Sequence, residues 1–235
     1  MQGEGRRGVA IVTAMGIEGL GLSRALEAGP WHRRLHRGWR EGLLGTCPVV
    51  LATCGVGYRA ARRWSNVLLE EYEPRLVILT GACAGVAPFV QVGDLVVGES
   101  VCRVAGLGVT ARFPADPDIL ALAQEAAAAA RLRPVGGHEP RVLAAAMASV
   151  DRLVARQAWG ERLAREHGVL AIEMEAAAIA EACQGPRVPF LAVRAISELV
   201  GSRWQWLSMV RNLVPVQRNA ERLVFALVQF LSEET

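Results

Sequence analysis

The feature that most constrains this chain is an alternation of short apolar runs with segments of helical periodicity. The apolar runs are rich in Val, Ile and Leu, and they are GVAIVTAM (8–15), PVVLATCGVG (48–57), RLVILTGACAG (75–85), GDLVVGESV (93–101), VLAIEME (169–175) and VPFLAVRAISE (188–198). Helical patterns lie near 17–28, 58–72, 116–131, 152–167, 175–184 and 205–232, and a β-hairpin pattern covers 31–45. Apolar strands that alternate with helices predict an α/β fold, with three α/β/α layers around a mixed, mostly parallel sheet.

Nothing in the sequence divides the chain into two parts. The 235 residues contain no long Pro/Gly/Ser-rich stretch and no block of like charge, so we expect a single domain over residues 1–235. The apolar runs are interrupted by Arg or Glu before the ~20 residues that a membrane span needs. Two arginines precede the first apolar run as in a signal peptide, but Glu18 and several glycines stand where the cleavage site would be. We therefore expect a cytoplasmic protein with no membrane partner.

Composition excludes several kinds of chemistry. The sequence contains no lysine, so all 26 Lys and Arg residues are arginine, which excludes a Schiff base and a phosphate-loop lysine. The five cysteines form no C-x-x-C pair and are interpreted as buried thiols in a reducing compartment. The net charge of +3 is small and the arginines are dispersed, so we expect no nucleic-acid partner. GVGYRA lacks the third glycine of a dinucleotide fingerprint, and we expect no cofactor and no metal.

Three glutamates follow apolar strands at the same end. Glu18 comes just after the first run, Glu175 ends VLAIEME, and Glu198 ends VPFLAVRAISE. Ligands of open parallel sheets bind at this edge, and partial burial raises carboxyl pKa values toward those useful in proton transfer. For each glutamate alone, a role confined to a helix N-terminus is an equally good interpretation. The three together favour a functional site.

A resemblance to a known family is carried by five segments in the correct order and spacing. They are AIVTAMGIEG, ATCGVGYRAA, VILTGACAGVAPFVQVGDLVV, LAIEMEAAAIAEAC and VPFLAVRAISE. Together they resemble the nucleoside phosphorylase/uridine phosphorylase superfamily, and within it the methylthioadenosine/S-adenosylhomocysteine nucleosidases. The resemblance implies a homodimer and hydrolysis of the N-glycosidic bond of a 5′-modified purine nucleoside.

The resemblance also implies a role for individual residues. Glu18 corresponds to the residue that activates the attacking water, and Glu175 to the one that binds the ribose 2′- and 3′-hydroxyls. Met174 packs against the sugar. Glu198 corresponds to the acid that protonates N7 of the departing purine. Carboxylates suit this reaction because they stabilise a cationic, oxocarbenium-like transition state.

Further contacts are expected around these residues. The resemblance places Gly81 and Ala82 in the glycine-rich turn beside the ligand, and Ser197 directly before Glu198. Leu153 and Val154 are expected to contact the base. Arg194 is expected either to contact substrate or to form an ion pair with Glu175 or Glu198.

The sequence departs from the family pattern in three ways. Glutamate replaces aspartate at position 198, which moves the acid by about one C–C bond, and a misplacement of that order can reduce a rate by ~10²-fold. The segment after GDLVV is shorter than usual and lacks the family's base-side loop. Ala82 replaces a serine. These departures leave the identity of the base open, with futalosine and adenosylhopane as alternative substrates and a catalytically impaired nucleoside-binding protein as an alternative of another class.

The choice of nucleophile depends on arginines. Phosphorolytic relatives hold phosphate with arginines in the first loop and just before the glycine-rich turn. Here the first loop carries Glu18, and Leu79 stands at the second position. A carboxylate would repel phosphate, so water is expected. Arg24, Arg59 and Arg194 keep a phosphate-dependent purine nucleoside phosphorylase open as an alternative.

Overall fold

The elements of the fold follow the predicted alternation of strands and helices. The computed structural model describes residues 7–34, 37–106, 108–152, 156–203 and 205–233. The strands are β1 (Arg7–Thr13), β2 (Glu27–Arg34), β3 (Arg37–Leu44), β4 (Cys47–Thr53), β5 (Pro74–Gly85), β6 (Leu95–Ala105), β7 (Gly108–Pro114), β8 (Val142–Ser149), β9 (Val169–Glu173) and β10 (Phe190–Leu199). The helices are the 3-10 turn η1 (Gly16–Gly19), α1 (Leu20–Ala25), α2 (Tyr58–Tyr72), α3 (Pro117–Ala129), α4 (Gln157–His167), α5 (Ala176–Gln184) and α6 (Gln205–Glu233).

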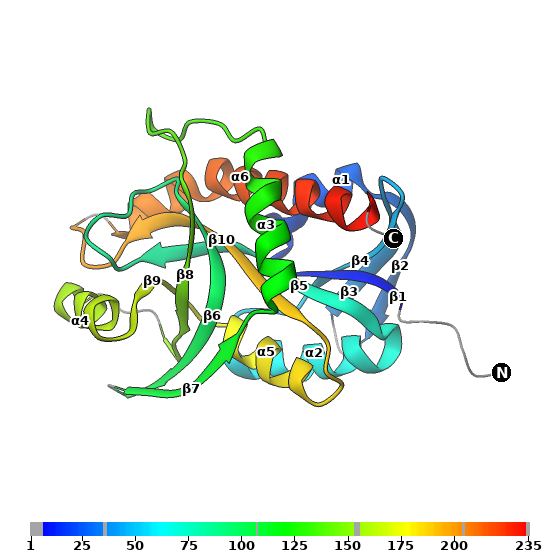
Figure 1. Ribbon diagram of the computed structural model, residues 1–235, viewed down its shortest axis with the longest axis horizontal. Helices are drawn as coiled ribbons and strands as arrows, with labels where there is room; N and C mark the ends of the chain where they lie inside the picture. The colour runs from blue at the N-terminus through cyan, green and yellow to red at the C-terminus, as the bar shows by residue number, and fades with distance from the viewer. Residues whose placement is uncertain (1–6, 35–36, 107, 153–155, 204, 234–235) are drawn as a thin grey trace.

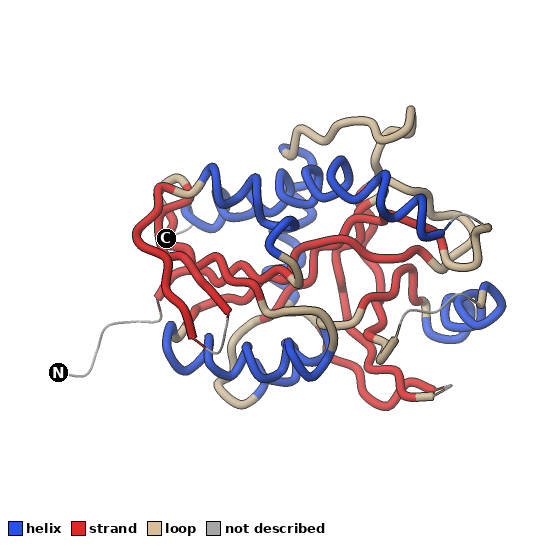
Figure 2. The backbone as a smooth tube through the Cα atoms, turned by 180° about the vertical axis from the view of Figure 1, so that it is seen from behind, coloured by secondary structure: helices blue, strands red, loops and turns tan. Residues whose placement is uncertain are grey.

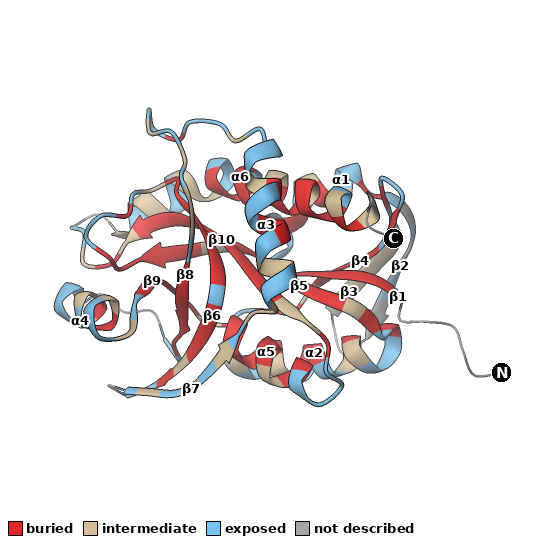
Figure 3. Cartoon of the chain, viewed as in Figure 1, coloured by how far each residue is buried: buried red, intermediate tan, exposed pale blue. Residues whose placement is uncertain are grey.

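Helices cover both faces of a central sheet (Figures 1 and 2). The helices α1, α3 and α6 lie on one face, and α2 and α5 lie side by side on the other. Each layer has its own apolar core, because the strands present buried side chains to both sides (Figure 3). The predicted α/β fold with a mixed sheet is confirmed.

The sheet combines parallel and antiparallel pairs. Parallel pairs join β1 to β4 and β5, β5 to β10, β6 to β8, and β8 to β9. Antiparallel pairs join β2 to β3, β3 to β4, β5 to β9, β6 to β7, and β6 to β10. The strands β5, β10, β6, β8 and β9 pair in a closed ring, and β1 to β4 extend the sheet from it.

Strand β5 exchanges neighbours halfway along its length. Its first half pairs with β1 up to Leu79, opposite Val12, and its last residues pair with β9, where Ala84 lies opposite Ile172. Strand β10 pairs with the other edge of β5 from Val77 to Gly85. Residues 80–83 therefore have no strand partner on one edge. This opening is a topological switch point, where α/β sheets bind ligands.

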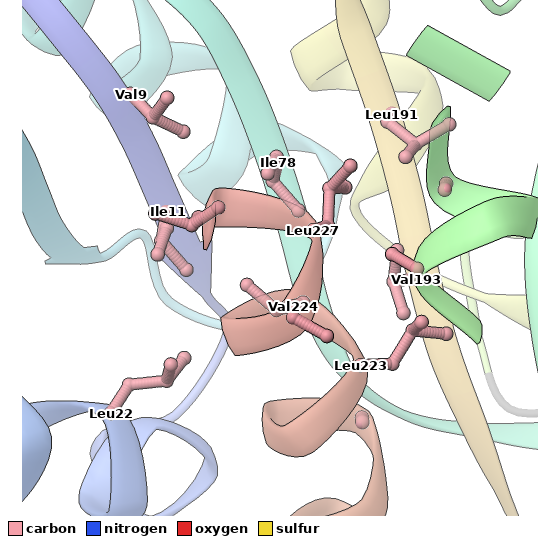
Figure 4. Packing of buried hydrophobic residues seen from close by; sticks show 14 of the residues in the cluster. Val9, Ile11, Leu22, Ile78, Leu191, Val193, Leu223, Val224 and Leu227 are labelled. Carbon is pink, nitrogen blue, oxygen red and sulfur yellow. The ribbon is translucent and has the colours of Figure 1, made fainter. Parts of the chain in front are cut away.

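Helix α6 packs along β5 and β10 through one fully buried face (Figure 4). Leu223, Val224 and Leu227 meet Ile78 of β5 and Val193 of β10 in this core. Burial of each such side chain stabilises the fold by ~1.5–3 kcal/mol. Helix α6 is therefore tightly packed against one face of the sheet.

The structure differs from the predicted elements in three places. The expected helix near 17–28 is only η1 and α1, and β2 already begins at Glu27. The segment after GDLVV forms the end of β6 and the hairpin strand β7, whose residues alternate between exposed and half-buried. Strand β8, VLAAAMAS, was not predicted, because its alanines favour helix and carry little of the β-branched signal of strands.

Candidate functional site

Glu18 is buried at the opening in β5. It follows β1 on the turn η1, and only 2% of the residue is exposed. Its Oε1 accepts a hydrogen bond of 3.0 Å from the Ala82 amide of β5, and its Oε2 accepts one of 2.8 Å from the Met15 amide. Burial raises the pKa of Glu18, and Arg194 and the two amides partly offset this. The carboxylate thus takes the place of a strand partner beside Ala82.

Arg194 connects three carboxylates across the opening. Its Nη2 lies 2.6 Å from Glu175 Oε2 and 3.2 Å from Glu173 Oε2, and its Nη1 lies 4.0 Å from Glu18 Oε1. Nη1 also donates to the Thr80 carbonyl at 3.0 Å. Burial alone would lower the pKa of Arg194, but the surrounding carboxylates raise it above its ordinary value. We call Arg194, Glu18, Glu173 and Glu175 the Arg194 cluster.

Glu175 joins the cluster to helix α2. It is the N-cap residue of α5, and its Oε1 accepts a hydrogen bond of 2.8 Å from the Gly57 amide. The CGVG turn (54–57) thus directs an amide at an oxygen of the protein itself. Of the two alternatives for Arg194, the structure shows an ion pair with Glu175, and among the described residues Arg194 forms none with Glu198. Glu175 is 3% exposed and is held from two sides.

Glu173 is a member of the cluster that sequence analysis did not single out. Its Oε2 accepts hydrogen bonds of 2.8 Å from the amides of Glu175 and Ala176, and its other oxygen accepts one from the Ser149 hydroxyl. Burial raises the pKa of Glu173 to about 6, with Arg194 opposing the shift. The E-x-E spacing was the available signal, because residues two apart at a strand end share one face.

Glu198 has a different environment from the Arg194 cluster. It lies on β10 after a β-bulge between Ile196 and Glu198 and is 4% exposed. Its carboxyl contacts the Ser197 hydroxyl, which lies 3.3 Å from the Cys83 carbonyl. Among the described residues, no arginine or histidine forms an ion pair with it. Burial raises the pKa of Glu198 to about 7, although the Ser197 hydrogen bond acts in the opposite direction.

The other predicted residues are placed as follows. Gly81 and Ala82 border Glu18 and Arg194. Met174 is half-buried and lines a cavity of about 650 Å³, together with Val56, Gly57, Tyr58, Arg59, Ala60, Arg103 and Asp151. Leu153 and Val154 lie outside the described residues. Arg24 and Arg59 are exposed, and Leu79 is fully buried.

Gly81 offers a direct test of the packing at the opening. Its φ is +146°, and an added Cβ would lie 2.2 Å from Arg194 Nη1 and 2.5 Å from Glu18 Oε1. We expect Gly81→Ala to lower the free energy of unfolding by about 2 kcal/mol or more and to reduce any turnover, because strain and overpacking add. Gly45→Ala is the matched control, since Gly45 has a φ of +64° and open space around it. Equal urea midpoints for the two variants would contradict this account.

Comparisons with known proteins identify the family of this chain. A sequence model of the phosphorylase superfamily matches residues 8–229. The chain belongs to the phosphorylase superfamily. A 5′-methylthioadenosine/S-adenosylhomocysteine nucleosidase of Aeromonas salmonicida (strain A449) is 31% identical over 175 residues, which are 68% of this chain and 73% of that protein. The predicted resemblance is thereby confirmed.

Solved structures of the superfamily share the whole fold. The Neisseria meningitidis 5′-methylthioadenosine/S-adenosylhomocysteine nucleosidase with methylthio-immucillin-A is 26% identical, with a TM-score of 0.82 over 94% of this chain and 98% of that one. A futalosine hydrolase of Helicobacter pylori is 17% identical, with a TM-score of 0.83 over 95% and 97% of the two chains. At that identity the second likeness concerns the fold alone.

Two properties of the described residues concern membranes and metal ions. None of the helices in the described part of the chain has both the length and the apolarity that a bilayer crossing requires. Within the same residues, no three His, Cys, Asp or Glu side chains are grouped so that they could hold a metal ion. The five cysteines are all buried and free, as the sequence predicted.

Proposed function

We propose that this chain is an N-glycosyl hydrolase that releases the base of a 5′-modified purine nucleoside of the methylthioadenosine/S-adenosylhomocysteine type. The observation that carries the proposal is the presence of two carboxyl environments at one sheet edge. Glu18 and Glu175 are held beside Arg194, whereas Glu198 is buried and, among the described residues, has no cationic partner. Arg194 favours the ionised form of Glu18 and burial favours the neutral form of Glu198, which supports a base and an acid at one site.

Each carboxyl has a distinct task in the proposed reaction. Glu175 accepts hydrogen bonds from the ribose hydroxyls, and Met174 packs against the sugar. Glu18 positions water and accepts its proton as the water attacks the anomeric carbon. Protonated Glu198 donates to N7, so that the purine leaves as a neutral molecule. The carboxylates of Glu18 and Glu175 stabilise the positive charge that develops on the ribose.

The same geometry favours water over phosphate as the nucleophile. Arg194 is already engaged by two carboxylates and the Thr80 carbonyl, and Glu18 lies beside it. A phosphate dianion at this place would meet the Glu18 carboxylate beside a guanidinium whose charge is already balanced by carboxylates. We therefore expect base release at the same rate with and without phosphate. Release that requires phosphate would instead identify a phosphorylase.

Glu18→Gln tests the water-activating role. We expect kcat to fall by about 10²–10⁴-fold, because glutamine cannot accept the proton of water. The folded structure should persist, since the glutamine carbonyl still accepts a hydrogen bond from the Ala82 amide. The assay is release of free base, with Glu125→Gln on the exposed side of α3 as the control. Turnover of Glu18→Gln at the wild-type rate would remove this role.

A substrate panel separates the remaining candidates. Methylthioadenosine, S-adenosylhomocysteine, an inosine analogue, futalosine and adenosylhopane differ in the base and in the 5′-substituent. Preference for an adenine base with a 5′-thioether supports the proposal, whereas futalosine or adenosylhopane as the best substrate reassigns the enzyme within its superfamily. Thermal stabilisation by a nucleoside without base release would identify a nucleoside-binding protein.

The proposal extends to assembly and location. We expect a single domain that forms a homodimer in the cytoplasm. Support for a homodimer comes from large apolar side chains that are exposed on neighbouring elements, namely Ile17 and Leu20 of η1 and α1, and Trp206, Leu207 and Val210 of α6. Light scattering at micromolar concentration distinguishes a dimer from a monomer.

A further inference from the structure

Two polar side chains of α6 are buried against the segment that carries Glu18. Gln217 is 3% exposed and Glu221 is 7% exposed. They lie four residues apart and therefore share one face of the helix. Gln217 Nε2 donates to the main-chain oxygen of Glu18. Glu221 Oε1 accepts hydrogen bonds from the amides of Gly21 at 2.7 Å and Leu22 at 3.4 Å.

The short helix α1 depends on Glu221 for its N-terminal cap. It has only six residues, and its own N-cap residue, Gly19, supplies no side-chain hydrogen bond. The free amides of its first turn are instead satisfied by Glu221 from α6. Glycine at position 21 leaves room for this contact, because an added Cβ would lie 2.2 Å from Glu221 Oε2.

Gln217 is not explained by fold stability. In the described residues its Oε1 is buried and has no hydrogen-bond partner. An unpaired buried acceptor destabilises a fold, and an apolar side chain of similar size would avoid that loss. What the amide adds is a hydrogen bond to the carbonyl of Glu18. Its placement therefore points to control of the backbone at Glu18.

Helix α6 is held in place by the core and can therefore fix the position of the backbone that it contacts. Val216, Ala220 and Leu223, which alternate with these two polar residues, are fully buried in the core under the sheet. In the Glu18 segment, Ile17 and Leu20 on either side of Glu18 and Gly19 are exposed, and Leu22 is buried in the same core. The backbone from Glu18 to Leu22 is thus fixed from the interior by α6.

We propose that Gln217 and Glu221 are positioning residues for Glu18. They hold the backbone of residues 18–22 so that the Glu18 carboxylate stays on the Ala82 amide, in place to activate water. This inference rests on the proposed function, because it concerns the residue assigned to water activation. A displacement of about 1 Å at such a group can reduce the rate by about 10²-fold.

Gln217→Leu is the first test. We expect kcat for base release to fall by about 10–100-fold, with a much smaller change in KM, because the Glu175 contacts to ribose are untouched. The melting temperature should change little, because removal of the unpaired Oε1 offsets the loss of the hydrogen bond to the Glu18 main-chain oxygen. Gln229→Leu, three turns further along α6 and exposed, is the matched control and should behave as wild type.

The pair Glu221→Gln and Glu221→Leu is the second test. Glutamine keeps an acceptor for the Gly21 and Leu22 amides, so activity should fall in the order wild type, Glu221→Gln, Glu221→Leu. Amide hydrogen exchange should accelerate over residues 18–22 in Glu221→Leu and Gln217→Leu, and the decline of activity at high pH should keep its midpoint, because Glu198 is unchanged.

The outcomes separate this inference from the proposed function. A wild-type protein that releases no base from any nucleoside of the panel overturns the proposed function. An active wild type whose Gln217→Leu and Glu221→Leu variants keep kcat within twofold and show unchanged exchange over residues 18–22 overturns only the positioning role. A loss of activity that follows a fall in melting temperature also overturns it, since the two residues would then act on folding.

Discussion

Replacing Glu198 with glutamine should reduce kcat for base release by about 10²–10⁴-fold, the range that general acid catalysis contributes. Glutamine keeps the size and the contact with Ser197 but has no proton to give to N7. The Ser197 hydroxyl donates to the Glu198 carboxyl and lies 3.3 Å from the Cys83 carbonyl. Burial keeps the carboxyl protonated below about pH 7, and the Ser197 contact orients it before substrate arrives.

The pH dependence gives a second measurement of the same residue. Because the pKa of Glu198 is raised to about 7 and its protonated form is the active one, wild-type kcat should decline roughly tenfold per pH unit above pH 7. A separate decline at lower pH should report protonation of Glu18, whose pKa burial also raises. The contribution of Glu198 to the free energy of unfolding also falls as the pH rises. The stability contributed by Glu198 is fully present below its ordinary pKa of 4.5 and is lost as the pH rises to about 7. Glu198→Gln should remove both dependences.

Glu198→Asp tests the departure from the aspartate of related enzymes. It keeps an acid but withdraws the carboxyl by one methylene, so we expect an activity between those of wild type and Glu198→Gln. Glu125→Gln again serves as the control. Wild-type turnover in Glu198→Gln, or a high-pH decline that persists in that variant, would show that another group protonates the base.

Replacing Arg194 with methionine should destabilise the fold by about 3–5 kcal/mol, because it leaves buried carboxylates without their cation. Glu18, Glu173 and Glu175 all lie within 4.0 Å of the guanidinium. The comparison is Arg162→Met, which breaks an exposed ion pair with Glu166 on α4 and should change stability by about 0.5 kcal/mol or less. Urea denaturation followed by circular dichroism measures both.

Two further measurements test whether the loss of stability in Arg194→Met comes from the unpaired carboxylates. Removal of the cation raises the pKa values of Glu18 and Glu173 further, so the destabilisation should be largest at high pH and should shrink as these two carboxyls become protonated. The double variant Arg194→Met/Glu173→Gln should recover part of the stability, because it removes one uncompensated charge. A loss that is independent of pH and of Glu173 would mean that packing of the arginine, and not its charge, supports the fold.

The sequence predicted the parts of the fold whose hydrophobic pattern is strong. The runs that became β1, β5 and β10 are nearly continuous in Val, Ile and Leu, as strands buried on both faces require. Strand β7 lies at the edge of the sheet and exposes every second residue, so GVTARFP had the composition of a loop. Strand β8 was hidden by its alanines.

The site was predicted where residues end strands and missed where partners come from elsewhere in the chain. Glu18, Glu175 and Glu198 follow apolar runs, and this position alone marked them. Glu173 was missed because it lies two residues before Glu175, which ends the same apolar run and gave the clearer signal. Gln217 and Glu221 look like the solvent face of a polar helix, because nothing local shows that α6 turns this face toward η1. Contacts across about 200 residues are a property of the packed fold, not of the local pattern.

Residues 80–83 of β5 lack a strand partner on one edge, and this affects which site residues would be kept if the protein lost its activity during evolution. The Ala82 amide needs an acceptor whether or not chemistry takes place, and Glu18 supplies it at 3.0 Å. Within the part of the chain that the structure describes, Glu198 accepts no main-chain hydrogen bond, and its burial opposes folding when it is ionised. A descendant that is no longer selected for catalysis should therefore lose the acid at position 198 early and keep an oxygen-bearing side chain at position 18. The residue at 198 would then distinguish active from inactive relatives, whereas the residue at 18 would be shared by both.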